Sequence, residues 1–519
     1  ILAGVTQLSD FNGDGMADLH CNLPISGQYW ALLSTGTDLV GVANGLPGHN
    51  SITTITNSLG GTIELTYKPL TDSSVYSKAT DSPSYPVKNV QEPRYVVAQY
   101  LKSDGRENSY PYSYRYAGAK MSLDGRGSLG FASVTVADQT LGTQLVTRYN
   151  QPFPLTGTVA SATRNCSPGN SNLCGGSVDA VILRHSDYSY TTTSNNQVTQ
   201  VFRSAQRTDR YDFGSYKYSL GESYSQDEYG NQTGIANLGY MDLTGDDLQP
   251  GDNIYTCRQY FPPAPAENSR SVNLQYQKIS KTLASCAALT TWNDLEDLRR
   301  QSRSYDTAGN LIQRQRWDNT QGTKGGWLTS TYSYDSFGNR TSTIGPAGNA
   351  TKTPDAYRYG TSYDTTYHTF PSTKTSPGAQ GVGLLTTQLE YDPGSGVLTQ
   401  KTDPNGHVTQ SLLDGFGRVV AHLGEDPQDP QGPLVTLSKR LWGQDVIGNY
   451  IETLSLTDWQ SQDCWANGSC PWQKHYFDGL KRNFQVVSQS PDPSDNITLQ
   501  QREYGALTQV AKSSQPYFE

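Results

Sequence analysis

Long apolar runs, charged residues and methionine are all scarce in this sequence of 519 residues. Only 34% of the residues are hydrophobic, 17% are charged and 3 are Met, whereas Tyr (34), Gly (50) and Pro (27) are frequent. No stretch approaches the roughly 18 apolar residues that a membrane helix needs. Disordered chains lack aromatic residues and are strongly charged, so the composition also argues against disorder. Because Tyr packs through its ring and reaches water with its hydroxyl, it suits a sheet with one wet face, and we expect an all-β fold.

Long runs of basic residues are also missing. The net charge is -9, and no run of Lys and Arg is long enough to follow a phosphate backbone, so we expect no nucleic-acid partner. The first residues, "ILAGVTQLSD", contain neither a starting Met nor the basic region of a signal peptide. We therefore expect an internal fragment of a longer protein with no membrane span of its own. A signal or anchor upstream stays open.

Motifs of enzyme chemistry are absent as well. The seven His residues are scattered, and there is no His-Glu-x-x-His, no Gly-x-Ser-x-Gly elbow and no phosphate-binding Gly-Lys-Thr or Gly-Lys-Ser. A glycosidase needs only two carboxylates at a suitable separation, which the sequence of a β-sheet does not reveal. We expect a protein that is not an enzyme, and a carbohydrate-active enzyme remains an alternative.

Seven cysteines fall into three local pairs and one remainder. The pairs are Cys166 with Cys174, Cys257 with Cys286, and Cys464 with Cys470, each bracketing loop-like sequence, and Cys21 is left over. None has metal-ligand spacing with a partnering His. We expect disulfides that staple loops in an oxidising compartment, with free buried thiols as the alternative.

The stretch "DFNGDGMADL" has the spacing of a calcium loop. Asp10, Asn12, Asp14 and Asp18 occupy positions 1, 3, 5 and 9, Gly15 stands at the sharp turn, and the carbonyl of Met16 at position 7 would complete the cage. Position 12 is Cys21 and not Glu, which rules out the helix-flanked EF-hand. We expect a β-hairpin loop that holds a structural Ca²⁺, and a hydrated turn without metal is the alternative.

A second pattern recurs over the C-terminal part of the chain. An aromatic residue leads into Asp, a Gly supplies a positive φ, and a new strand follows, as in "YDTAGNLIQRQRW" and "YSYDSFGNRTSTI". Recurrence at nearly 30 residues indicates stacked repeats. The aspartates occupy turn positions beside Gly, where a structural role is sufficient, and we read "TDPNGHVTQ" as a proline-preset turn. The predicted turn residues are Tyr305, Asp306, Gly309, Tyr334, Asp335, Gly338, Tyr363, Asp364, Tyr391, Asp392, Asp414, Gly417, Asp478 and Gly479.

These repeats resemble the tyrosine-aspartate repeats of the Rhs family. Three further motifs, "NSLGGTIELTYKPLTD", "SLDGRGSLGFASVTVAD" and "TRYNQPFPLTGTVAS", resemble, in the family's order, the B components of insecticidal toxin complexes and the related Salmonella plasmid-virulence proteins. The resemblance implies three parts: residues 1–50 as the end of a calcium-loop β-propeller, 51–205 as the toxin-complex middle segment, and 206–519 as a spiralling antiparallel repeat shell.

The resemblance also implies a function. Such shells enclose a toxic C-terminal domain, so we expect a structural segment of a secreted bacterial toxin. A C-terminal toxin cargo or a C-component-like subunit would be its partner, and a pore-forming subunit would deliver it. An extracellular adhesion protein with a teneurin-like shell is the second hypothesis. The aspartate-based cleavage motif of these shells would lie beyond Glu519.

Overall fold

The computed structural model describes most of the chain. It covers residues 5–9, 18–23, 28–34, 39–43, 51–106, 108–167, 180–195, 198–242, 244–261, 273–320, 325–351, 353–378, 383–426, 429, 431–456, 464–490, 495–505 and 509–518. The first four ranges are the strands β1 (Val5–Ser9), β2 (Asp18–Leu23), β3 (Gln28–Ser34) and β4 (Leu39–Ala43), which pair in that order into an antiparallel sheet. The propeller edge expected for this segment stays a prediction.

The all-β fold is confirmed, because one large sheet contains most of the chain. Its first strands are β5 (Thr54–Thr56), β6 (Thr62–Pro69), β7 (Tyr76–Ser77), β9 (Tyr95–Ser103), β10 (Ser109–Ala117), β13 (Ser133–Asp138), β14 (Thr143–Tyr149), β15 (Val159–Cys166), β16 (Val181–Asn195), β17 (Val198–Asp212), β18 (Ser215–Gln226) and β19 (Gln232–Met241). The middle strands are β20 (Ile254–Tyr260), β21 (Leu274–Ser280), β22 (Asp297–Tyr305), β23 (Leu311–Trp317), β24 (Trp327–Tyr334), β25 (Arg340–Ile344), β26 (Arg358–Tyr363), β27 (Pro371–Ser376) and β28 (Leu385–Tyr391). The last strands are β29 (Leu398–Thr402), β30 (Val408–Leu413), β31 (Val419–Gly424), β32 (Val435–Gln444), β33 (Asn449–Ser455), β34 (Trp472–Phe477), β35 (Asn483–Gln489), β36 (Asn496–Tyr504), β37 (Val510–Ser513) and β38 (Tyr517–Phe518).

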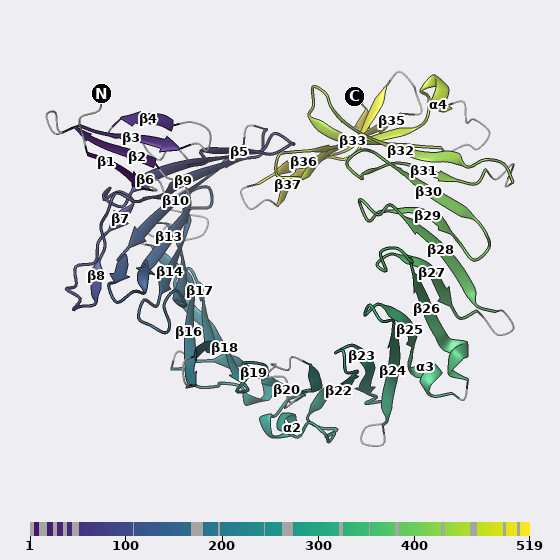
Figure 1. Cartoon of the computed structure of the whole chain (residues 1–519), viewed down its shortest axis with the longest axis horizontal. Helices are drawn as coiled ribbons and strands as arrows, with labels where there is room; N and C mark the ends of the chain where they lie inside the picture. Colours follow the sequence, from purple (N-terminus) through teal and green to yellow (C-terminus); the bar gives the residue numbers. More distant parts are fainter. Residues whose placement is uncertain are drawn as a thin grey trace.

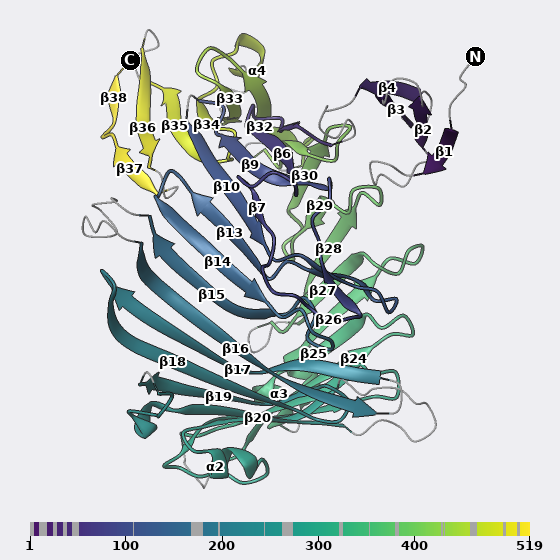
Figure 2. The same ribbon diagram turned by 90° about the vertical axis from the view of Figure 1, so that its left-hand side faces the viewer.

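From β13 to β36 each strand pairs antiparallel with the next one in sequence, so the sheet grows as a meander. The sheet curves until its ends meet, and Figure 1 shows the strands arranged as a closed wall around a central space. Figure 2 shows the long strands β14 to β18 crossing this wall obliquely. Strands that follow one another in sequence usually lie side by side when short turns join them. A meander is therefore the simplest way to build such a wall.

The remaining elements are short and lie on the wall. A three-stranded sheet contains β8 (Val87–Asn89), β11 (Lys120–Ser122) and β12 (Gly127–Gly130). The helical turns are η1 (Pro250–Asp252), α2 (Leu283–Ala287), α3 (Pro346–Asn349), η3 (Pro354–Tyr357) and α4 (Cys464–Asn467). None of the helices in the described ranges is long and apolar enough to cross a membrane.

Two small apolar cores lie at the two ends of the sheet. The first contains Leu70, Val75, Tyr76, Val90, Ala98 and Ala119, and the second contains Tyr476, Phe484 and Val487. Many other buried side chains are polar, such as Ser186, Ser219 and Thr498. A single-layer wall buries little apolar surface per residue, which accounts for the low aliphatic content of the sequence.

Candidate functional site

The repeat turns are each held by the side chain of their aspartate. Asp306 Oδ1 accepts the backbone N–H groups of Ala308 (3.0 Å) and Asn310 (2.8 Å), and Oδ2 accepts the side-chain amide of Asn310 (3.0 Å). Gly309 has a φ of +87°, which glycine adopts without a steric penalty. These hydrogen bonds, with those from Asn310 the strongest, lower the pKa of Asp306. The carboxylate is therefore ionised at neutral pH and engaged in the turn.

The same arrangement recurs along the chain. Asp335 binds the N–H groups of Phe337 (3.0 Å) and Asn339 (2.9 Å), and Gly338 has a φ of +83°. Further turns of this kind are Asp227 with Asn231, Asp403 with His407, and Asp414 with Gly417 and Arg418. Asp392 binds the N–H of Gly394 (2.8 Å), and Asp364 closes a wider turn in which His368 takes the positive φ. In most of these turns the ladder register shifts at the residue before Asp, as in a three-residue hairpin loop with a bulge.

Three of the repeat tyrosines have a role that the sequence did not reveal. Tyr334 Oη donates to the carbonyl of Leu311 (2.9 Å), and Tyr363 Oη donates to that of Arg340 (3.3 Å). Leu311 and Arg340 are the first strand residues after the preceding turn. Tyr305 makes the same bond to Leu274 (3.2 Å). Each hydroxyl therefore ties one repeat to the repeat before it, which is why a Phe at this position would not be equivalent.

Successive turns also contact one another, and together they form what we call the turn ladder. Asn339 Nδ2 donates to the carbonyl of His368 (2.6 Å), and the rings of Phe337 and His368 stack at 3.8 Å. The rings of Phe370 and Tyr391 stack at 5.5 Å, which links the next pair of turns. The ladder thus runs along one edge of the wall and holds neighbouring repeats in register.

The last turn of the ladder meets the first strands, and we call this the closing contact. Asn57 Nδ2 donates to the carbonyl of Gly479 (2.7 Å), and the N–H of Gly479 donates to the carbonyl of Asp104 (2.6 Å). Arg482 Nη2 lies 2.9 Å from Asp104 Oδ2, while its Nε lies 2.7 Å from Asp478 Oδ2. Asp104 and Asp478 are only 1% and 2% exposed. A buried, paired network of charges therefore joins the two ends of the sheet.

Gly479 has a different role from the one predicted. In this turn Lys481 takes the positive φ (+64°), whereas Gly479 is needed because the backbone of Gly61 lies against it. A Cβ on Gly61 would lie 2.3 Å from the carbonyl oxygen of Gly479, closer than atoms can approach. The close backbone approach is the reason for both glycines.

Sequence reasoning missed Asp104, which shapes a turn identical in kind to the repeats. Asp104 Oδ1 accepts the N–H groups of Arg106 (2.9 Å) and Asn108 (3.2 Å), and Oδ2 accepts the Asn108 side chain (2.7 Å). The signal was present in "SDGRENS", an Asp followed by Asn four positions later. It was hidden because no Tyr precedes the Asp.

Disulfides anchor two outer loops. The structure joins Cys257 on β20 to Cys286 on α2, and Cys464 to Cys470 beside α4, as two of the predicted pairings have it. Cys166 is disulfide-bonded, and its predicted partner Cys174 lies outside the described residues.

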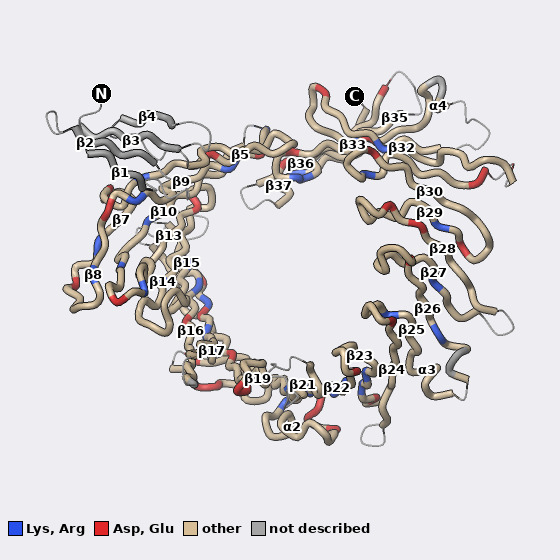
Figure 3. Tube along the Cα trace, viewed as in Figure 1, with Lys and Arg blue, Asp and Glu red and all other residues tan. Residues whose placement is uncertain are grey.

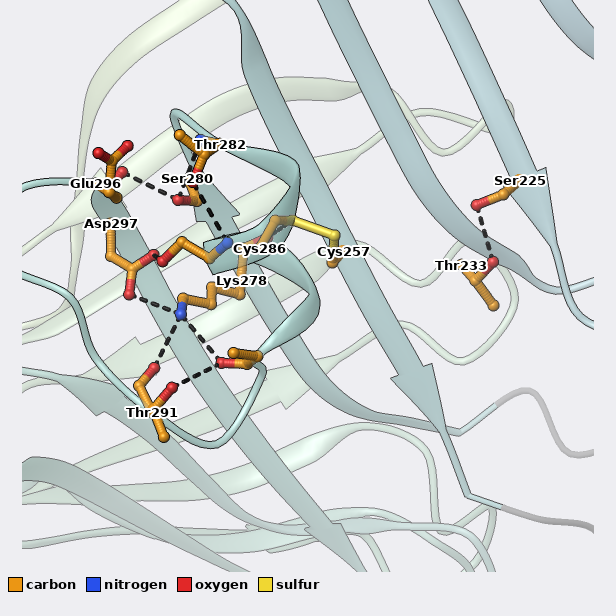
Figure 4. The surroundings of a disulfide bond; sticks show 12 residues. Ser225, Thr233, Cys257, Lys278, Ser280, Thr282, Cys286, Thr291, Glu296 and Asp297 are labelled. Atoms are coloured by element: carbon orange, nitrogen blue, oxygen red, sulfur yellow. Dashed lines mark hydrogen bonds and ion pairs between the residues drawn. A yellow bond between two sulfur atoms is a disulfide. The ribbon is translucent and has the colours of Figure 1, made fainter.

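Figure 4 shows the first disulfide beside Lys278, whose side chain is fully buried. Lys278 Nζ lies 2.7 Å from Asp297 Oδ2 and donates to the carbonyls of Ala288 (3.0 Å) and Thr291 (2.9 Å). A buried Lys with a carboxylate and two carbonyl partners is satisfied, so this cluster fixes the loop between β21 and β22.

The predicted calcium residues fall almost entirely outside the described part of the chain. Asp10, Asn12, Asp14 and Met16 lie outside it, and Asp18 is the first residue of β2. In the described ranges no group of three or more His, Cys, Asp or Glu side chains could hold a metal ion.

Two hollows bear on the enzyme alternative. One of about 590 Å³ is lined by hydroxyl and amide residues together with Trp472, without a carboxylate. The other, of about 280 Å³, is lined by Asp364 and Glu390 among aromatic residues. Asp364 accepts four backbone N–H groups, and these bonds outweigh the effect of burial and hold its pKa well below the ordinary value. A carboxylate so engaged stays ionised at neutral pH and is a poor proton donor.

Comparisons with known proteins point to one group. Residues 3–154 match the family model described as the insecticide toxin TcdB middle/N-terminal region. None of the curated protein sequences compared with the chain matches it.

Solved structures share the fold along nearly the whole chain. A crystal structure of TcdB2-TccC3 without its hypervariable C-terminal region aligns with 99% of this chain at 12% identity and a TM-score of 0.65. TcdB2-TccC3-Cdc42 aligns with 99% at 12% identity and a TM-score of 0.66, and the Photorhabdus luminescens Tc holotoxin pore with 99% at 11% and 0.64. The chain spans only 37–38% of the length of these proteins.

Proposed function

Because residues 3–154 belong to the TcdB middle/N-terminal family and the whole chain has the fold of the TcdB2-TccC3 shell, we propose that this protein is a segment of a hollow β-shell that encloses a toxic polypeptide. The observation that carries the proposal is the closing contact. Asp104, Arg482 and Asp478 join the two ends of the sheet through a buried network, so the wall surrounds a space.

The nature of the wall supports a structural role. The carboxylates of the repeats are engaged in turns, and the tyrosine hydroxyls are engaged in ties between repeats. A shell of this kind needs rigidity, which the turn ladder supplies, and closure, which the closing contact supplies. The proposal is accordingly of a non-enzymatic segment, in a secreted toxin, whose partners are a C-terminal cargo or C-component-like subunit and a pore-forming delivery subunit.

The experiment that tests enclosure uses the longer protein that contains these residues. Cryo-electron microscopy should show additional polypeptide density inside the wall, and limited proteolysis should spare the enclosed polypeptide until the wall is unfolded. An empty interior, together with digestion of that polypeptide at the rate seen for the isolated domain, would overturn the proposal. An exterior loop bound to a surface glycan or receptor would instead favour the adhesion hypothesis.

The calcium loop is a separate part of the proposal. Asp10, Asn12, Asp14 and Asp18 carry oxygen ligands at the spacing of a calcium cage, with the Met16 carbonyl as a further ligand. Terbium luminescence of the chain, displaced by Ca²⁺, should be lost in Asp14→Asn. Equal terbium binding by wild type and variant would leave a metal-free turn as the explanation.

A further inference from the structure

The orientation of the strands fixes which side chains point to the enclosed space. In Figure 1, α2, α3 and α4 lie outside the wall. Lys278 reaches the carbonyls of Ala288 and Thr291 beside α2, Thr331 contacts Asn349 of α3, and Lys439 lies over Trp465 of α4. These three side chains therefore face outward.

The outward assignment extends across the sheet through the ladder register. Side chains directly opposite on paired strands share a face, and successive side chains alternate. The pairs Lys278 with Arg300 and Thr331 with Ile344 continue the outer face, and Ala421 opposite Lys439 agrees with it. Three independent anchors thus give one consistent inner face from β20 to β33.

The inner face is basic. The Lys and Arg side chains that this register places on it are Arg258, Arg299, Arg303, Arg314, Arg316, Lys374, Lys401 and Arg440. Arg303 lies directly opposite Arg314, although like charges at such positions repel. Arg299, Arg316 and Lys401 are exposed. Figure 3 shows basic residues recurring along this part of the wall.

No acidic side chain of the strands β20–β33 balances this face. The acidic residues in these strands are Asp297, Glu390 and Glu452, and the register places each of them on the outer face. Asp297 is already paired with Lys278. In the described part of the chain none of the eight inner cations forms an ion pair. The other acidic residues of this stretch lie in turns and loops, as Asp306 and Asp335 do. Asp318, directly after β23, interacts electrostatically with Arg316 but does not form an ion pair with it.

We propose that this inner basic face, β20–β33, binds an acidic segment of the enclosed polypeptide. The inference rests on the proposed function, since it needs a polypeptide inside the wall. Unpaired cations that repel one another gain most from carboxylates that come between them. Each exposed pair is weak, so many of them hold a chain while allowing it to leave. The register places Gln277, Gln301, Leu328 and Ser330 beside the arginines of β22 and β23. Tyr332 and Trp442 lie farther along the same face, and because aromatic side chains can stack with bases, the test must separate an acidic peptide from single-stranded nucleic acid.

The test measures fluorescence anisotropy of the 519-residue chain with a labelled poly-glutamate peptide of about 20 residues, since electrostatic binding should weaken as salt screens it. The expected result is binding that weakens at least tenfold as salt is raised from low to high concentration. Poly-lysine of the same length should not bind. The triple variant Arg303→Gln, Arg314→Gln, Arg316→Gln should weaken poly-glutamate binding at least tenfold.

The matched control neutralises Lys68, Arg94 and Lys512, three exposed cations in surface ion pairs, and changes the net charge equally. It should change binding less than twofold. If the first triple variant misfolds, Lys374→Gln with Lys401→Gln and Arg440→Gln tests another sector of the same face. Equal loss in test and control variants, preference for single-stranded DNA, or binding of poly-lysine overturns the inference.

Electron microscopy of the same samples distinguishes failure of the basic-face inference from failure of the proposed function. A closed wall that does not bind poly-glutamate removes the basic-face inference and leaves enclosure standing. An open sheet removes the proposed function itself.

Discussion

Arg482 and Asp104 are 378 positions apart in sequence, yet the Arg482 guanidinium lies 2.9 Å from the Asp104 carboxylate. Burial opposes the charge of Arg482, but hydrogen bonds with Tyr110 and Asp478 outweigh it and raise its pKa. The residue is therefore a permanent cation between two buried carboxylates. This single side chain links the last turn of the ladder to the first strands, and the closure of the wall depends on it.

Replacing Arg482 with Met should destabilise the closed wall. The substitution leaves Asp104 and Asp478 buried without their cation, which typically costs about 3–5 kcal/mol of unfolding free energy. Urea unfolding monitored by tryptophan fluorescence measures the change. Arg115→Met, an exposed arginine on β10, is the matched control and should change stability by less than about 0.5 kcal/mol. If the two variants unfold alike, the network does not stabilise closure.

The glycines of the closing contact should resist substitution. Gly61→Ala places a methyl group 2.3 Å from the carbonyl oxygen of Gly479, so one backbone must move. The hydrogen bond from the Gly479 N–H to Asp104 should then open, and hydrogen exchange of that amide should accelerate by at least tenfold. Gly326→Ala, where the added methyl would meet no atom within 4 Å, is the control. Unchanged exchange at Gly479 in Gly61→Ala would show that the close approach is not required.

The turn aspartates should make the shell sensitive to acid. Hydrogen bonds lower the pKa values of Asp306 and Asp414 in the folded chain. An Asp in the unfolded chain titrates near pH 3.9. Because the folded pKa is lower, the unfolded state takes up protons first, and the stabilisation present above about pH 4 is lost as pH falls through the folded pKa. The thermal midpoint should fall steeply between about pH 5 and pH 2.

Asp335→Asn separates the charge from the shape of the turn in the same experiment. The pKa of Asp335 is also lowered, since its bonds with Asn339 outweigh burial. The variant keeps an acceptor oxygen but does not titrate, so its midpoint should be lower at pH 7 and should depend less on pH. If the thermal midpoint of the variant depends on pH as steeply as that of the wild type, the ionised Asp335 carboxylate does not contribute to the acid sensitivity of the shell.

Much of this architecture could be predicted because its determinants are local. An Asp, a Gly three positions on and an Asn or Arg after it suffice to specify the hairpin at Asp306 and Asp335. The low aliphatic content and the frequent Tyr correctly indicated an all-β fold. The recurrent tyrosine also marked the repeats correctly, although its tie to the preceding turn is a contact between repeats that no single repeat encodes.

The closing contact could not be predicted from the same information. Asp104 and Asp478 have similar local turns, and nothing in their spacing states that the two turns meet. Gly479 was assigned a conformational role because a Gly follows the Asp, whereas its partner Gly61 makes the requirement steric and non-local. The inner basic face was hidden for a related reason. Alternation in sequence separates two faces, but only the positions of α2, α3 and α4 identify which one is outside.

The two described disulfides should contribute unequally to stability. Cys257 and Cys286 are 29 positions apart, and Cys464 and Cys470 are 6 apart. A cross-link stabilises mainly by restricting the unfolded chain, and the effect grows with loop length, so removal should cost roughly 3–4 kcal/mol for the longer loop and roughly 2 kcal/mol for the shorter one. Cys257→Ser with Cys286→Ser tests the first, and Cys464→Ser with Cys470→Ser tests the second. Removing the first disulfide should also loosen α2, which lies over the buried Lys278 and Asp297. The loss of unfolding free energy should therefore exceed that for the second disulfide by more than loop length alone predicts. Equal losses in the two double variants would show that loop length and the buried pair do not determine how firmly the outer loops hold the wall.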